Sequence, residues 1–172
     1  MKKKLISILL ITLSLSGFIS CRKQSPQLPS NKGNVPDKNT AIMLDINQEL
    51  ALKEDNIIKC LAEKDKAFRK NELGFWYKID QKSTGAKLKE KDVCKFSCKM
   101  ELLNGKILKT DIRQVVIGKK ELVVGLEEGL KLMHKGESAT FIVPSYLGYG
   151  MKGNPPLVKA FTSLIFKIKL YE

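Results

Sequence analysis

Hydrophobic and polar residues alternate with a period of two along the middle of the chain. The alternation covers residues 75–80 and, over nine positions, residues 94–102. Successive side chains of a strand point to opposite faces, so the pattern predicts two half-buried β-strands. Asn104-Gly105 follows directly and predicts a tight hairpin with positive φ at both residues. The return strand is expected to begin at residues 107–108.

The C-terminal part of the chain combines short apolar stretches with one helical pattern. The apolar stretches at residues 141–143 and 164–170 predict the last strands, and residues 115–117 form another apolar stretch. Residues 125–133 have helical spacing, and the apolar face of this short helix consists of Leu126, Leu130 and Met133. Many short strands around one short helix indicate an α+β domain, which we place at residues 72–172.

Residues 45–70 have a helical rather than a strand pattern. Leu50, Ile57 and Leu61 recur near the helical spacing, and neither glycine nor proline interrupts residues 37–72. We therefore predict a helical extension at residues 41–71, made of one or two helices. Its apolar residues could dock on the following domain or pair with another copy of the chain, and docking is the favoured interpretation.

The first residues have the pattern of an export signal. Three lysines precede an apolar run at residues 5–15, and Ser20 precedes Cys21. This end of the run resembles a bacterial lipobox, so residues 1–20 are expected to be a signal peptide and Cys21 a lipidated N-terminus. Residues 21–40 are polar and predict a disordered tether. The alternatives are an uncleaved membrane anchor and a soluble secreted protein with an unmodified Cys21.

The net charge of +13 narrows the choice of partners only slightly. Export and the lack of aromatic residues interleaved with basic ones argue against nucleic acid as a partner, whereas acidic lipid head groups or an anionic partner remain compatible. The chain has a single histidine, His134, which rules out a multi-histidine metal cluster. Cys94 and Cys98 lie four apart on one strand, roughly 13 Å, which is too far for a disulfide. Cys60 could pair with neither of them or with one.

Two motifs resemble the FKBP-type peptidyl-prolyl isomerases. Gly125-Leu126-Glu127-Glu128-Gly129 opens the predicted helix, and Tyr149 lies between two glycines in Leu-Gly-Tyr-Gly. The resemblance covers residues 72–172 and implies an antiparallel β-sheet wrapped around a short helix, preceded here by the helical segment. With the predicted lipid anchor and tether, the layout also resembles the FKBP lipoproteins of gliding motility.

The resemblance implies a site that needs neither cofactor nor metal. Its implied catalytic residues are Tyr149, Val123, through its N–H, and Phe166. Its implied substrate-binding residues are Leu108, Leu122, Leu126, Leu157, Val158 and Cys98. The sequence departs from the family at Leu126 (tryptophan), Cys98 (tyrosine), Leu108-Lys109 (phenylalanine–aspartate), Arg113 (phenylalanine) and Lys159-Ala160 (proline pair).

These departures decide what function we expect. The family pattern implies a peptidyl-prolyl cis-trans isomerase that assists folding of proline-containing polypeptides in the bacterial envelope, anchored through Cys21 and facing the periplasm. Lost aromatics predict weakened activity, and Lys109 replaces a carboxylate by an ammonium. The alternative is an FKBP-fold binding or chaperone module with weak or no isomerase activity. The oligomeric state stays open.

Overall fold

The structure is a computed structural model that describes the backbone of residues 38–172 and the side chains of residues 42–172. The chain divides into two units, residues 1–41 and residues 42–172, and the second contains the whole sheet. The predicted signal peptide, Cys21 and the predicted tether up to residue 37 lie outside the described residues.

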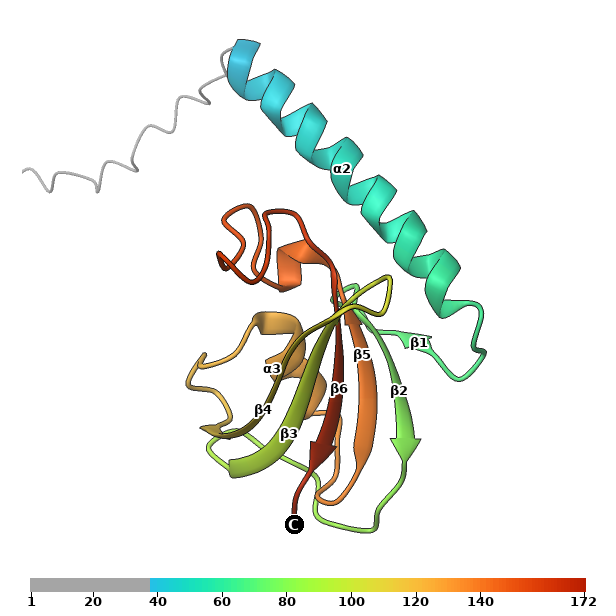
Figure 1. The fold of residues 1–172 in the computed structure, drawn as a ribbon, viewed down its shortest axis with the longest axis vertical. Helices are drawn as coiled ribbons and strands as arrows, with labels where there is room; N and C mark the ends of the chain where they lie inside the picture. The colour runs from blue at the N-terminus through green and yellow to red at the C-terminus, as the bar shows by residue number, and fades with distance from the viewer. Residues whose placement is uncertain (1–37) are drawn as a thin grey trace, which may run out of the picture. The chain divides into compact units, whose positions relative to one another are not determined.

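Six antiparallel strands form one sheet in the order β1-β2-β5-β6-β3-β4, and Figure 1 shows them side by side with β1 and β4 at the edges. The strands are β1 (Arg69–Lys70), β2 (Trp76–Gln81), β3 (Val93–Leu102), β4 (Ile107–Val116), β5 (Ser138–Val143) and β6 (Leu164–Leu170). Within residues 38–172 the helices are α2 (Lys38–Ala62), α3 (Val124–Leu130) and the short 3₁₀ turn η1 (Ser145–Leu147). The predicted α+β class, with an antiparallel sheet, one short helix and an N-terminal helix, is confirmed.

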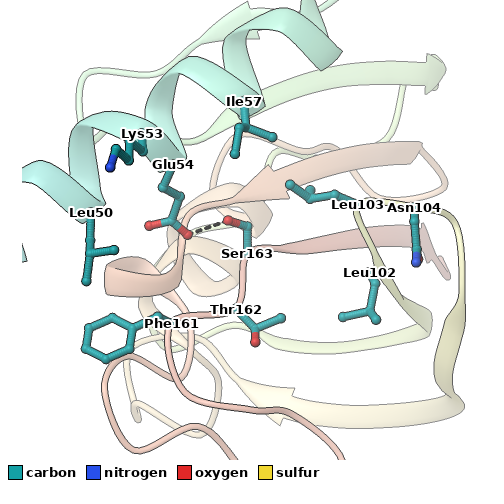
Figure 2. A pocket seen from close by; sticks show the side chains of 10 residues that line it. All are labelled: Leu50, Lys53, Glu54, Ile57, Leu102, Leu103, Asn104, Phe161, Thr162 and Ser163. Atoms are coloured by element: carbon teal, nitrogen blue, oxygen red, sulfur yellow. Dashed lines mark hydrogen bonds between the residues drawn. The ribbon is translucent and has the colours of Figure 1, made fainter.

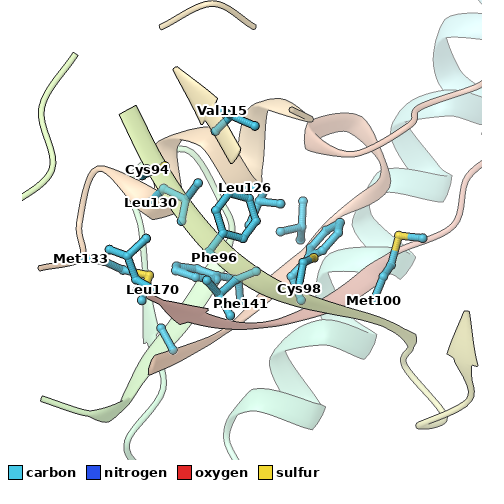
Figure 3. Close-up of a cluster of buried hydrophobic side chains, with 14 of the residues drawn as sticks. Cys94, Phe96, Cys98, Met100, Val115, Leu126, Leu130, Met133, Phe141 and Leu170 are labelled. Atoms are coloured by element: carbon cyan, nitrogen blue, oxygen red, sulfur yellow. The ribbon is translucent and has the colours of Figure 1, made fainter. Parts of the chain in front are cut away.

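The main core lies between one face of the sheet and α3, and Figure 3 shows its buried side chains. The alternation predicted for β3 is real, because its inward residues Cys94, Phe96, Cys98 and Met100 are all buried. Glycine lets α3 lie close to β5: a Cβ at Gly129 would come within 2.7 Å of Phe141 Cε1. The two glycines of the helix motif therefore serve packing.

Two predicted details differ from the structure. The predicted helix 125–133 ends at Leu130, although Met133 is still buried in the turn that follows. In the hairpin only Gly105 has positive φ, at 84°. The Leu102 carbonyl accepts from Gly105 N–H at 2.9 Å, so a turn followed by a left-handed glycine replaces the predicted two-residue loop.

Helix α2 ends at Ala62 rather than near residue 70. The chain then turns through Asp65, whose carboxylate accepts from the Ala67 N–H at 3.0 Å. Arg69 and Lys70 form β1 and pair with Tyr77 and Trp76 of β2. Strand pairing therefore overrides the helical spacing beyond residue 62.

The C-terminal half of α2 docks on the outer face of the sheet, as the favoured interpretation expected. Ile58 and Ala62 are buried against Ile142. Leu61, Phe68, Trp76, Leu103 and Ile165 surround this smaller cluster. Exposed apolar residues dominate the other half: Ile42, Met43, Leu44, Ile46 and Leu50. Pairing of that half with another copy stays a prediction.

The three cysteines of the described region are unpaired. Cys94 and Cys98 are buried and Cys60 is exposed, and none of the three forms a disulfide. No helix among residues 38–172 combines the length and the apolar character needed to cross a membrane.

Two adjacent isoleucines test the docking of α2. Ile58 is fully buried and Ile57 is 59% exposed. We expect Ile58→Ala to lower the free energy of unfolding by about 2–5 kcal/mol, because it opens a cavity under the helix. Ile57→Ala, the matched control, should change it by less than about 0.5 kcal/mol. Urea unfolding followed by fluorescence of Trp76, the one tryptophan of the chain, measures both. Equal effects would mean that α2 does not pack where the structure places it.

Candidate functional site

A small pocket opens between the β3–β4 edge of the sheet, the start of α3 and the segment between β5 and β6. It is lined by Cys98, Met100, Lys109, Asp111, Arg113, Val123, Leu126, Tyr149, Asn154, Leu157 and Phe166. Its free volume of about 80 Å³ is far below the roughly 300–1,000 Å³ of pockets for drug-sized ligands, so it suits one small ring.

All three residues predicted as catalytic line this pocket: Val123, Tyr149 and Phe166. Of the residues predicted to bind substrate, Cys98, Leu126 and Leu157 also line it. The other three do not, because Val158 is buried in the core and Leu108 and Leu122 pack against the core half-buried. The structure thus brings together most of the predicted site residues in one pocket.

Sequence reasoning found only part of the charged wall of the pocket. Side chains of a strand alternate between faces, so Lys109, Asp111 and Arg113 of β4 share the face that lines the pocket, and Leu108 falls out of this row. Asp111 Oδ2 lies 2.7 Å from Lys109 Nζ. The expected ammonium of Lys109 thus lines the pocket, but the carboxylate of Asp111, which was not expected, lies beside it.

A signal for this wall exists in the sequence. Val115 is buried on the same strand, so counting back by two from it selects Arg113, Asp111 and Lys109. Met100 could have been found in the same way, because its alternation partner Cys98 was already assigned to the site. Asn154 lies in an irregular segment and carries no comparable pattern.

Arg113 and Cys98 have different electrostatic surroundings. Arg113 Nη2 donates only to the Glu121 carbonyl oxygen, at 3.4 Å, and no carboxylate of the described residues forms an ion pair with it. Cys98 lies opposite Asp111 in the β3–β4 register. Burial, together with the Asp111 charge, raises the pKa of the Cys98 thiol to about 11. Cys98 is thus a neutral, small wall residue near neutral pH and not a thiolate nucleophile.

The corner before α3 presents a backbone donor. The Val123 carbonyl accepts from the N–H groups of Leu126 and Glu127, both at 3.0 Å, which starts the helix. Glu127 is buried and accepts from the Gly118 N–H at 2.8 Å, so it holds the connection that leads to Val123. Within residues 38–172 no protein group accepts from the Val123 N–H, which leaves this donor for a ligand.

Backbone hydrogen bonds hold Tyr149 on a short loop. The Ser145 carbonyl oxygen accepts from both glycines that flank it, Gly148 at 3.0 Å and Gly150 at 2.8 Å. The Tyr149 carbonyl oxygen accepts from Gly153 at 3.2 Å. The Tyr149 hydroxyl forms no hydrogen bond with any group in the described part of the chain, so it is free to bind a ligand.

This arrangement can hold a small ring and a carbonyl group. Leu126, Leu157 and Phe166 supply apolar contact, and the Val123 N–H and the Tyr149 hydroxyl supply hydrogen-bond donors. His134 does not line the pocket, and its Nδ1 lies 3.5 Å from Glu137 Oε2. No three His, Cys, Asp or Glu side chains of the described region converge as metal ligands.

A larger groove of about 480 Å³ lies beside α2, away from this pocket. Figure 2 shows its lining, which runs from Leu50 and Ile57 on the helix to Leu102 and Leu103 before the hairpin turn, and to Phe161. We regard the smaller pocket as the site, because free donors converge on it whereas the Glu54 carboxylate in the groove already has protein partners.

Curated relatives match part of the chain. A probable FKBP-type peptidyl-prolyl cis-trans isomerase of Haemophilus influenzae is 28% identical over 112 residues, 63% of this chain and 46% of that protein. The peptidyl-prolyl cis-trans isomerase FKBP11 of Bos taurus is 36% identical over 73 residues, 40% of this chain and 36% of that protein. The chain thus spans less than half the length of these two relatives.

Solved structures share the fold. A peptidyl-prolyl cis-trans isomerase from Pseudomonas syringae matches with a TM-score of 0.65 at 20% identity, covering 73% of this chain and 94% of that one. FkpA from Escherichia coli matches with a TM-score of 0.62 at 19% identity, covering 100% of this chain and 81% of that one. At these identities the likeness concerns the fold alone.

A model of one protein family matches half of this chain. The sequence model of the FKBP-type peptidyl-prolyl cis-trans isomerases matches residues 84–171, which is half of the chain and includes every residue of the pocket. The chain belongs to the FKBP-type peptidyl-prolyl cis-trans isomerase family.

Proposed function

We propose that this protein catalyses cis-trans isomerisation of peptide bonds that precede proline. The observation that carries the proposal is a small pocket in which three apolar residues, Leu126, Leu157 and Phe166, lie beside two unengaged donors. These donors are the Val123 N–H and the Tyr149 hydroxyl. Family membership supports the same reaction.

The reaction is a rotation and needs no acid, base or nucleophile. Amide resonance opposes the rotation with a barrier of about 18–20 kcal/mol, because the planar amide is polar and conjugated. In this proposal the proline ring enters the pocket against Leu126, Leu157 and Phe166, where the planar amide loses solvation relative to the twisted amide. The carbonyl of the twisted bond then accepts from the Val123 N–H and the Tyr149 hydroxyl, which are already in position.

The pocket also explains why we expect slow turnover. Leu126 stands where the family has a tryptophan and Cys98 where it has a tyrosine, so less aromatic surface contacts the ring. The Lys109–Asp111 pair brings hydrated charge to the rim, since Lys109 is 56% exposed in its side chain. An FKBP-fold binding module with little isomerase activity is the alternative outcome.

The hydroxyl of Tyr149 should matter for turnover. We expect Tyr149→Phe to lower kcat/KM about three- to tenfold, because one donor to the twisted carbonyl is lost. Tyr146→Phe is the matched control, since Tyr146 is exposed on the same segment and does not line the pocket. Phe166→Leu should also lower kcat/KM while keeping the buried site filled.

Rates of cis-to-trans conversion of a proline peptide measure these variants. A wild type no faster than buffer alone would favour the binding module. An active wild type that is insensitive to both pocket substitutions would show that the pocket is not the catalytic site.

The charged wall predicts a substrate preference. Arg113 faces the pocket without a carboxylate partner among the described residues, so a glutamate before the proline should be favoured over a lysine. We expect a two- to fivefold advantage, about the size of an exposed ion pair, and its loss in Arg113→Gln. Lys106→Gln removes the same charge from the hairpin turn and should leave the preference intact. An unchanged ratio of the two peptide rates in Arg113→Gln would contradict the assignment.

We further propose that the protein is a lipoprotein of the bacterial envelope that faces the periplasm and assists folding of proline-containing polypeptides there. The lysines, the apolar run and Ser20-Cys21 at the N-terminus support this location. Several acyl chains on Cys21 would anchor the protein stably, which a single chain would not. The finer likeness to gliding-motility FKBP lipoproteins belongs to the same proposal.

Lipid anchoring at Cys21 can be tested by fractionation. We expect the wild type to partition with membranes and to incorporate labelled palmitate, and Cys21→Ala to lose both properties. Cys60→Ala is the matched control, because Cys60 is an exposed cysteine of the folded part. If Cys21→Ala still carries the label, or if the wild type is found in the soluble fraction, the anchor proposal fails.

A further inference from the structure

One carboxylate of α2 binds two separate segments of the isomerase domain. Glu54 Oε1 accepts from the Ser145 N–H at 2.7 Å, and Oε2 accepts from the Ser145 hydroxyl at 2.8 Å. The Ser163 hydroxyl donates to Oε1 as well, and Figure 2 shows Glu54 pointing at Ser163. Both serines are buried, so each depends on this partner for its hydrogen bond.

The two serines bracket the segment that forms one wall of the pocket. Tyr149, Asn154 and Leu157 line the pocket, and all three lie between Ser145 and Ser163 in the chain. Both ends of this irregular segment are therefore fixed at the same carboxylate. Hydrogen bonds to a charged group are stronger than those between neutral groups, which makes this an effective clamp.

The contact continues from Ser145 to the loop of Tyr149. The Ser145 carbonyl oxygen accepts from the N–H groups of Gly148 and Gly150, on either side of Tyr149. The Gly150 carbonyl oxygen in turn accepts from Phe161 N–H at 3.0 Å. At the other end Ser163 precedes β6, which carries Phe166. Movement of Ser145 would thus reach Tyr149 through two hydrogen bonds.

Glu54 is used differently from the other acidic contacts of α2. Among the described residues no lysine, arginine or histidine forms an ion pair with it. Its neighbour Asp55 instead pairs with Lys70 of β1, at 2.8 Å, and both side chains are about 40% exposed. Asp55 ties α2 to an edge strand, whereas Glu54 ties it to the pocket.

We infer that Glu54 is a positioning residue for the isomerase site: it holds the segment 145–163 so that Tyr149, Asn154 and Leu157 face the pocket. Helix α2 lies outside residues 84–171, the part of the chain that matches the family, and none of its residues lines the pocket. Through Glu54 it nevertheless supports the pocket from outside. The effect on catalysis rests on the proposed isomerase function, whereas the effect on the loop does not.

Glu54→Ala, Glu54→Gln and Asp55→Ala in the full chain separate positioning from simple tethering. We expect Glu54→Ala to speed amide hydrogen exchange at Gly148 and Gly150 about tenfold, because the clamp opens locally. KM for a proline peptide should rise about three- to tenfold with a smaller change in kcat, since three pocket contacts loosen. Glu54→Gln keeps an acceptor oxygen and should restore most of both properties. Asp55→Ala should change neither.

The readouts distinguish the possible failures. Partial unfolding would lower the apparent kcat and leave KM unchanged, which would contradict positioning. Unchanged exchange at Gly148 and Gly150 in Glu54→Ala, or the same rise in Asp55→Ala, would overturn the inference. If Glu54→Ala does not fold, Ser145→Ala decides, because it removes one of the three hydrogen bonds and should raise exchange at the same glycines to a smaller extent. An inactive wild type would defeat the proposed function, and the exchange data would still test the clamp.

Discussion

The close contact between α3 and β5 is the constraint on which the pocket depends. The helix can lie this near the sheet only because Gly125 and Gly129 have no Cβ where Val143 and Phe141 pack. That contact fixes the start of α3, and with it the Val123 N–H and the Leu126 side chain at the pocket floor. Glu127 adds a hydrogen bond to Gly118 from the same turn. The helix motif thus determines the geometry of the site through packing, although only Leu126 of its five residues lines the pocket.

The fold was largely predictable because its signals are local. The alternation in β3, the glycine of the hairpin and the spacing of Leu126 and Leu130 each follow from backbone geometry within a few residues. The errors occurred where a distant partner decides the structure. Arg69 and Lys70 are helical by spacing but pair with Tyr77 and Trp76 of β2. Such pairings carry little signal in a single sequence.

The site was predictable to the extent that it rests on motifs. Tyr149 and Val123 are marked by flanking glycines and by a helix start, so resemblance could place them. Glu54 has no such mark, because a glutamate in a polar helix is usually solvent-exposed. Its partners, two serines far away in the chain, are equally ordinary in sequence. Their joint role becomes visible only when the three side chains are seen together.

The departures from the family pattern affect the pocket more than the core. Leu126 and Phe166 are buried, so they still fill the interior and the fold tolerates the smaller residue at position 126. The pocket wall is less tolerant, because catalysis by desolvation requires a dry surface and Lys109 and Asp111 are partly hydrated. Their mutual contact at 2.7 Å reduces the net charge of the wall and leaves Arg113 as its uncompensated cation. In the proposed isomerase this pair limits turnover, and Arg113 gives the pocket a means to select its substrates by charge.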